Sequence, residues 1–204
     1  MCDTIIASTS LKSIEITKCR LRHKQLQLIC CAIADNINGS IEEVFLNEMR
    51  INNSGAEAVS YLITQSAKLT SLHLKDAGLD CDTLLEISKG ISKNSTLEYL
   101  DLRHNIFDKN GLKALIMALK SSMCIKHLYM ESMNIHIAEA KLLSELIARD
   151  DCLIEELELS EADIDIEALD EIMAALVKAD NLRRLSLSKN ELDVSICDHL
   201  SLMP

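Results

Sequence analysis

Hydrophobic and polar positions recur along this chain with a period of about 28 residues, and a fixed period of this size predicts a stacked repeat architecture. The clearest copy is LEYLDLRHN, at 97–105, with Leu at the first, fourth and sixth positions and Asn at the ninth. Related phrases begin at residues 11, 41, 69, 97, 125, 154 and 182. We therefore expect a single domain over residues 1–204 that consists of about seven repeats.

Each repeat changes from a strand pattern to a helix pattern. In the clearest copy, Leu100 and Leu102 share one face of an alternating segment. Tyr99, Asp101 and Arg103 share the opposite face. The segment that follows has the i, i+3, i+6, i+7 spacing of a helix with one apolar face, at Leu112, Leu115, Ala118 and Leu119. Each repeat is therefore predicted to form a short strand followed by a helix.

A strand, a helix and a second strand in the same register form a βα unit. Repetition of this unit makes successive strands parallel neighbours and places all helices on one side. Because a helix is wider than the ~4.8 Å between strands, stacking bends the array. The predicted fold is thus α/β, a right-handed βα solenoid with a concave parallel sheet and convex helices.

This pattern resembles the ribonuclease-inhibitor type of leucine-rich repeat, which has 28 residues per unit and a full convex helix. The family places Asn or Cys at the ninth position, where this chain has Cys19, Met49, Ala77, Asn105, Met133, Ala162 and Asn190. Only three of these seven positions match, so we expect apolar packing to replace most of the buried polar ladder beneath the strands. Related repeats occur in ribonuclease inhibitor, in the sensing ends of innate immune receptors and in bacterial effectors.

The two ends of the solenoid carry separate expectations. Residues 1–10 include Ile5 and Ile6 and are predicted to form a partial cap. The last repeat ends in a shortened helical segment at 194–203. Either this segment caps the stack, or a partner or second copy covers the last strand, because solenoids generally need a polar terminal repeat.

Composition excludes several classes of function. The net charge of −11 argues against nucleic acid as a partner, since phosphate binding needs a basic face. The chain lacks an apolar run of the ~20 residues that a membrane span needs and has no signal-peptide pattern at its start. Its eight Cys include no CxxC pair, so we expect free thiols and no zinc. These features predict a cytoplasmic protein, or for a bacterial effector one that acts in the host cytoplasm.

The strand side chains that face away from the core are expected to line the concave surface. Three of the chain's five aromatic residues (Phe45, Tyr99 and Tyr129) fall there. Tyr and Arg dominate binding hot spots because they combine a large contact area with polar groups. The predicted partner-binding surface comprises Phe45, His73, Tyr99, Asp101, Arg103, His127, Tyr129, Glu131, Glu156 and Glu158. An alternative stays open, in which these residues are simply those of a solvated strand face.

The acidic stretch from Asp150 to Val177 contains eleven acids and no Lys or Arg. It has two readings. One is a solvated face that promotes solubility. The other is an acidic wall beside the tyrosines, formed by Glu131, Glu156, Glu158 and Glu161, that would favour a partner with a basic surface.

Motifs for metal binding and catalysis fail on spacing. Asp163, Asp165 and Glu167 imitate the start of a calcium loop, but Ala168 and Ala174 replace its required Gly and closing Glu. The three concave-side histidines occupy different strand positions without Cys among them: His73, His104 and His127. No Ser or Cys lies in a Gly-flanked nucleophile turn. We therefore expect no metal, no cofactor and no enzymatic activity.

The sequence thus predicts a non-catalytic protein–protein interaction module that binds through its concave face, as a stand-alone adaptor or a bacterial effector. Two alternatives remain. The Ran GTPase-activating protein uses the same repeat type, and Arg50, in a strand-to-helix turn, would be the candidate transition-state-stabilising residue. Self-association through an uncapped end is the other.

Overall fold

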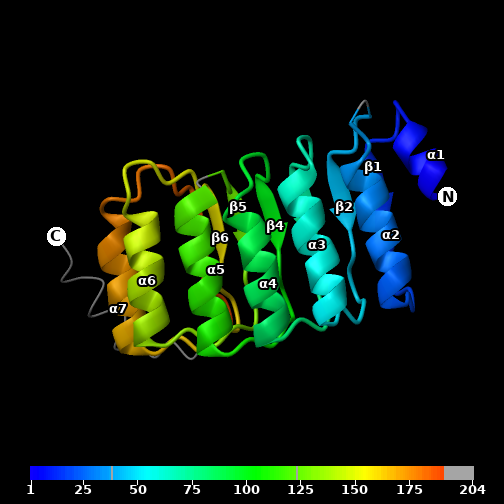
Figure 1. The fold of residues 1–204 in the computed structure, drawn as a ribbon. Helices are drawn as coiled ribbons and strands as arrows, with labels where there is room; N and C mark the ends of the chain where they lie inside the picture. Colours follow the sequence, from blue (N-terminus) through cyan, green and yellow to red (C-terminus); the bar gives the residue numbers. More distant parts are fainter. Residues whose placement is uncertain (38, 123, 191–204) are drawn as a thin grey trace.

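The computed structural model describes residues 1–37, 39–122 and 124–190. Within these ranges helices and strands alternate along the chain (Figure 1). They are α1 (Cys2–Ala7), β1 (Ser13–Glu15), α2 (His23–Ala34), β2 (Glu43–Phe45), α3 (Asn53–Gln65), β3 (Ser71–His73), α4 (Cys81–Ile91), β4 (Tyr99–Asp101), α5 (Lys109–Ser122), β5 (His127–Tyr129), α6 (Ile137–Ile147), β6 (Glu156–Glu158), α7 (Ile166–Leu176) and β7 (Arg184–Ser186). None of the helices in these ranges combines the length and hydrophobicity needed to cross a membrane.

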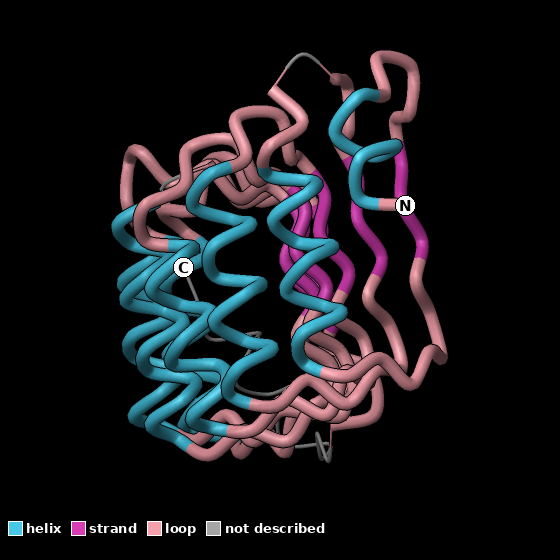
Figure 2. The backbone as a smooth tube through the Cα atoms, turned by 45° about the vertical axis from the view of Figure 1, so that its right-hand side comes forward, coloured by secondary structure: helices cyan, strands magenta, loops and turns pink. Residues whose placement is uncertain are grey.

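The strands form one parallel sheet in the order β1 to β7. Equivalent residues of neighbouring repeats pair across it, so that Tyr99 lies between Ser71 and His127. Figure 2 shows the strands along one side of the array and the helices along the other. This architecture confirms the predicted βα solenoid. Each strand is only three residues long, because the chain turns away toward its helix soon after the fifth position of the repeat.

The core lies between the sheet and the helices. Leu97, Leu100 and Leu102 are at most 1% exposed, as the alternating pattern predicts. The helices contribute their predicted stripes, which in α3 are Ala56, Val59, Leu62 and Ile63. Burying one such Leu stabilises the fold by about 1.5–3 kcal/mol. Since the same positions are buried in repeat after repeat, the remaining strand positions are forced onto the concave surface.

The buried ninth positions are mostly apolar, as the sequence predicts. Met49, Ala77, Met133 and Ala162 are all at most 4% exposed. Asn105 keeps the hydrogen-bonding side chain that the family places at this position. Its side-chain oxygen accepts a hydrogen bond from the Leu79 N–H (3.0 Å). Its amide group donates to the Leu74 and Leu102 carbonyls (2.8 and 2.9 Å). It thus satisfies backbone groups of two repeats that would otherwise be buried without partners.

A second set of asparagines, which the sequence patterns did not predict, joins the repeats at the opposite ends of the strands. The Asn94 amide donates to the Ile63 carbonyl (2.7 Å) and its oxygen accepts from the Leu97 N–H (2.7 Å). Asn36 donates to the carbonyls of Ile5 and Ile6 at 2.6 and 3.0 Å. These bonds fix the helix-to-strand connections to the preceding repeat.

The N-terminal end has the expected cap. Helix α1 packs against α2 and buries Ile5, while Ile6 stays 40% exposed. The segment 194–203, proposed as the other cap, lies outside the described residues. Asp80 and Asp108 precede α4 and α5 and accept hydrogen bonds from the N–H groups of Thr83 and Gly111.

The seven cysteines of the described ranges are free thiols. Cys30 is fully buried, and burial raises the pKa of its thiol to about 12. It therefore serves as a small apolar core residue.

The chain leaves every strand through the same left-handed turn. The eighth residue of each repeat has a positive φ between 48° and 67°, and none is Gly: Lys18, Glu48, Asp76, His104, Ser132, Glu161 and Lys189. A residue with a Cβ in this conformation costs roughly 1–2 kcal/mol. The turn is therefore a strained feature of the repeat itself.

Asp76 offers a direct test of this turn, because its exposed side chain has no hydrogen bond or ion pair among the described residues. Replacing it with Val, whose branched Cβ fits the left-handed region poorly, should lower the free energy of unfolding by about 1–2 kcal/mol. Asp76→Gly should leave stability unchanged or raise it slightly. Urea unfolding of both variants measures the difference. Equal stabilities for Val and Gly at this position would contradict the strain.

Gly90 allows a close approach between helices α3 and α4. A Cβ built there would lie 2.7 Å from the Ser60 carbonyl oxygen of α3. At Gly111, in α5, the nearest atom would be the Cys81 Cα at 3.3 Å. We expect Gly90→Ala to destabilise the protein by about 1–3 kcal/mol, because the clash involves backbone and exceeds the gain in helix propensity.

The matched variant Gly111→Ala should be much less harmful, since a shift of a few tenths of an ångström relieves its contact. Thermal and urea unfolding of the two variants provide the measurement. A Gly90→Ala protein as stable as the wild type would refute the close approach of α3 and α4.

Candidate functional site

The concave face is built from two rows of strand residues that lie side by side across the sheet. The third positions from β2 to β6 are Glu43, Ser71, Tyr99, His127 and Glu156. The fifth positions are Phe45, His73, Asp101, Tyr129 and Glu158. The parallel register therefore brings together residues that are far apart along the chain, as the sequence predicts.

Four aromatic side chains, which we call the aromatic stack, form a continuous series across β2 to β5: Phe45, His73, Tyr99 and Tyr129. The Phe45 and His73 rings are stacked, with centroids 4.0 Å apart. The ring centroid of Tyr99 lies 4.7 Å from that of His73 and 5.0 Å from that of Tyr129. Contacts of this kind are worth about 0.5–1.5 kcal/mol each beyond their buried area. The rings therefore support one another and present a largely preformed surface.

Asp101 and Arg103 form a fork beside the stack. Arg103 donates from Nε and Nη2 to the two carboxylate oxygens of Asp101, at 2.9 and 2.7 Å. Its guanidinium carbon also lies 5.3 Å from the centroid of the Tyr129 ring, within cation–π range. The hydrogen bonds to Asp101 hold the pKa of Arg103 above its usual value, so this side chain keeps its charge.

The position of Asp101 differs from the expectation of a solvated strand residue. It is 1% exposed, because the fork with Arg103 and the neighbouring His73 ring cover its carboxylate. Its role in the site is therefore to orient Arg103. Arg103 keeps 29% of its side-chain surface exposed and is the member of the pair that a partner can reach.

His73 is the half-buried centre of the stack. Its Nε2 lies 2.9 Å from the Ser71 hydroxyl and 3.5 Å from Glu43, and its Nδ1 lies 4.0 Å from Asp101. Burial lowers the pKa of His73, although the two carboxylates act in the opposite direction. The imidazole is therefore neutral at neutral pH, and it packs in the stack as an uncharged ring.

The C-terminal side of the stack is closed by Glu156. Tyr129 donates its hydroxyl to Glu156 at 2.7 Å, and His127 lies 3.6 Å from the same carboxylate oxygen. Burial raises the pKa of the Tyr129 phenol, and the hydrogen bond from Tyr129 lowers the pKa of Glu156. Glu156 thus belongs to an internal network and holds the Tyr129 ring in place.

The other predicted acids lie at the margin of the stack. Glu131 Oε2 lies 3.7 Å from Nε2 of His104. The Glu158 carboxylate accepts a hydrogen bond of 2.9 Å from the Ser160 N–H. Glu161 forms an ion pair with Lys189. Much of the charge of these acids therefore already has a partner within the protein.

Two contributors were absent from the predicted site. Glu43 approaches His73, and Arg184 lines a shallow hollow with Tyr129 and Glu156. Both occupy the third position of their repeats, next to residues that were predicted. Alignment of that row across the strands places both on the concave face, although they were not included in the predicted partner-binding surface. In residues 1–37, 39–122 and 124–190, no group of three or more His, Cys, Asp or Glu is arranged to hold a metal ion.

The half-buried His73 predicts a specific acid sensitivity of the fold. Because its pKa is lowered on folding, its contribution to stability is complete above the unfolded-state value of about 6.5 and is lost as the pH falls through the folded-state value. His73→Phe keeps a ring in the stack but cannot titrate. We expect the wild type to lose more unfolding free energy between pH 7.5 and 5.5 than this variant, by urea titration.

The control for this experiment is His136→Gln, at an exposed position before α6. It should retain the wild-type pH dependence. If His73→Phe and the wild type lose the same unfolding free energy between the two pH values, the half-buried imidazole does not titrate as described.

Comparison with known proteins agrees with the repeat architecture. A leucine-rich-repeat family model matches residues 93–115. The chain is 29% identical over 175 residues to NACHT, LRR and PYD domains-containing protein 14 of Mus musculus, and 22% identical over 198 residues to ribonuclease inhibitor of Mus musculus. These alignments cover 83% and 96% of this chain but 18% and 43% of the two relatives. The chain thus spans less than half the length of either protein.

Two solved structures share the fold over most of their length. The actin-binding site 2 of leiomodin-1 has a TM-score of 0.60 at 12% identity, covering 88% of this chain and 93% of that one. The tropomodulin C-terminal domain of Caenorhabditis elegans has a TM-score of 0.57 at 15% identity, with coverages of 88% and 90%. Together, the repeated phrase, the parallel solenoid and these matches identify the chain as a leucine-rich-repeat protein with repeats of the ribonuclease-inhibitor type.

Proposed function

We propose that this protein is a non-catalytic binding module that recognises a protein partner through the aromatic stack and Arg103 on its concave face. The observation that carries the proposal is the continuous series of rings contributed by four consecutive strands. A core role would have placed these side chains between sheet and helices. Instead they lie, partly exposed, on the opposite surface.

The order of this surface favours tight recognition. Hot-spot residues are typically aromatic or Arg side chains that a partner desolvates fully. Here Arg103 is oriented by Asp101, and Tyr129 by Glu156, before any partner arrives. A side chain already held in one conformation loses less entropy on binding, so more of its contact energy contributes to affinity.

The charge at the margin favours a partner with a basic surface. Glu43, Glu131 and Glu158 flank the stack and are only partly buried. Such acids speed the approach of a basic partner and do so less at high salt. The leiomodin-1 structure, an actin-binding site by its name, supports the view that a solenoid of this extent is sufficient for a binding module.

We further propose that the protein acts as an adaptor or a delivered effector in the cytoplasm. The alternatives of a GTPase regulator and of self-association stay predictions. Nothing in the described part of the chain favours either over the concave binding role.

The double variant Tyr99→Ala, Tyr129→Ala tests the proposal. Truncation of two hot-spot tyrosines should weaken partner binding by at least about 2 kcal/mol, or roughly 30-fold. The measurement is affinity capture from cell extract followed by mass spectrometry, with the dissociation constant then determined for each captured protein. Proteins captured by the wild type should be lost from the double variant.

Tyr61→Ala provides the matched control, because Tyr61 is an exposed tyrosine of the convex helix α3. It should capture the same partners as the wild type. Circular dichroism melts must show that the double variant remains folded. Unchanged capture by a folded double variant would refute concave-face recognition.

A further inference from the structure

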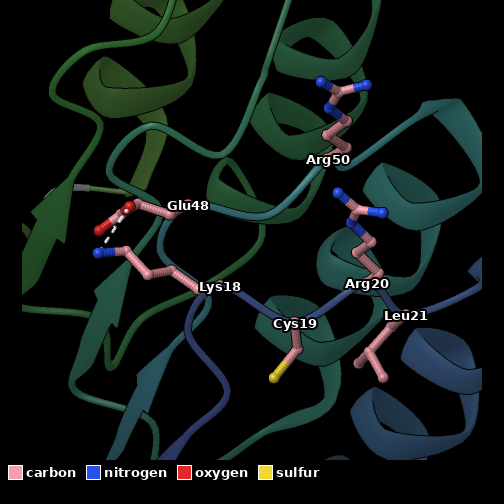
Figure 3. A pocket seen from close by; sticks show the side chains of 6 residues that line it. All are labelled: Lys18, Cys19, Arg20, Leu21, Glu48 and Arg50. Carbon is pink, nitrogen blue, oxygen red and sulfur yellow. Dashed lines mark ion pairs between the residues drawn. The ribbon is translucent and has the colours of Figure 1, made fainter.

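A basic hollow lies away from the aromatic stack, where the chain leaves the first two strands. It has a volume of about 510 Å³ and opens between the loops that follow β1 and β2. Its lining residues, drawn in Figure 3, are Lys18, Cys19, Arg20, Leu21, Glu48 and Arg50. Three cations and one acid in a protein of net charge −11 make this hollow a local reversal of the overall charge.

The two arginines occupy the same place in consecutive repeats. Arg20 and Arg50 are the tenth residues of the copies that begin at 11 and 41. Figure 3 shows their side chains extending in the same direction, one above the other. Both are exposed, and neither forms an ion pair or side-chain hydrogen bond with any residue of the described ranges. Two like charges in adjacent repeats repel each other unless an anion lies between or above them.

Elsewhere this chain places opposite charges at equivalent positions of neighbouring repeats. The second positions form such pairs, as Lys12 with Glu42 (2.5 Å), Lys126 with Glu98 (2.9 Å) and Arg183 with Glu155 (3.7 Å). Within the hollow, Lys18 pairs with Glu48 at 3.1 Å, on the side away from the arginines (Figure 3). The guanidinium groups of Arg20 and Arg50 are therefore the charges in the hollow that have no acidic partner among the described residues.

The chemistry of the unmatched pair points to phosphate. A guanidinium presents a planar fork of donors that fits phosphate or carboxylate oxygens with two hydrogen bonds. Two forks side by side suit an anion with more than one negative charge and several acceptor oxygens. An extended polyanion is disfavoured, because the remainder of the protein is strongly acidic and would repel a nucleic acid or an anionic membrane.

We propose that this hollow is a binding site for a compact, multiply charged phosphate group carried by a small molecule, held by Arg20 and Arg50. The site is separate from the concave surface and does not depend on the partner proposed for it. It gives the first two repeats a ligand of their own.

The test is calorimetric titration of the full chain with inorganic pyrophosphate at low ionic strength. Saturable binding is expected for the wild type. The double variant Arg20→Gln, Arg50→Gln should bind at least about tenfold more weakly, since each lost fork removes charge-assisted hydrogen bonds. The control Lys93→Gln, Lys113→Gln removes the same charge at exposed helix-side positions and should bind as the wild type does.

Three outcomes would overturn the proposal. One is no saturable binding to the wild type beyond that seen with chloride at matched ionic strength. Another is equal binding by the two double variants, which would indicate a general charge effect. The third is sedimentation of the wild type, but not of the arginine variant, with phosphatidylserine vesicles in the presence of excess pyrophosphate, which would indicate a membrane surface as the ligand.

Discussion

The structure depends on the parallel hydrogen bonding of each short strand to the equivalent residues of the next repeat. This pairing places a residue beside those about 28 positions before and after it along the chain. Columns of like position therefore run the length of the molecule, one column of leucines in the core and others on the surface. The register must be known before residues of different repeats can be recognised as neighbours. This applies to the paired charges, to the series of rings and to the two unmatched arginines.

The sequence was sufficient to predict the architecture, because equivalent leucines in many repeats each indicate the same strand and core positions. Leu97, Leu100 and Leu102 each have counterparts in other repeats, so a single substitution does not obscure the period. The strand positions of the stack followed from the same alternation. That the rings lie on the concave face was therefore predictable, and their contact distances were not.

Features that depend on side-chain conformation escaped the sequence patterns. Asp101 occupies a position that alternation assigns to solvent, yet it is buried because Arg103, two residues away on the same face, covers it. The connections made by Asn36 and Asn94 depend on buried carbonyls that no periodicity identifies. The left-handed conformation of the eighth residues could not be predicted for another reason. Gly is the usual sequence signal of a positive φ, and none of these residues is Gly.

The close approach at Gly90 has a consequence for the opposite side of the molecule. A βα solenoid curves because its helix layer is wider than its strand layer. A Cβ at Gly90 would lie 2.7 Å from the Ser60 carbonyl oxygen, so α3 and α4 approach more closely than any larger residue at this position would permit. A closer pair of helices narrows the helix layer, and a narrower helix layer calls for less bending. The corresponding strands, β3 and β4, carry His73 and Tyr99. The size of one residue on the convex side thus helps to set how flat a surface the rings offer on the concave side.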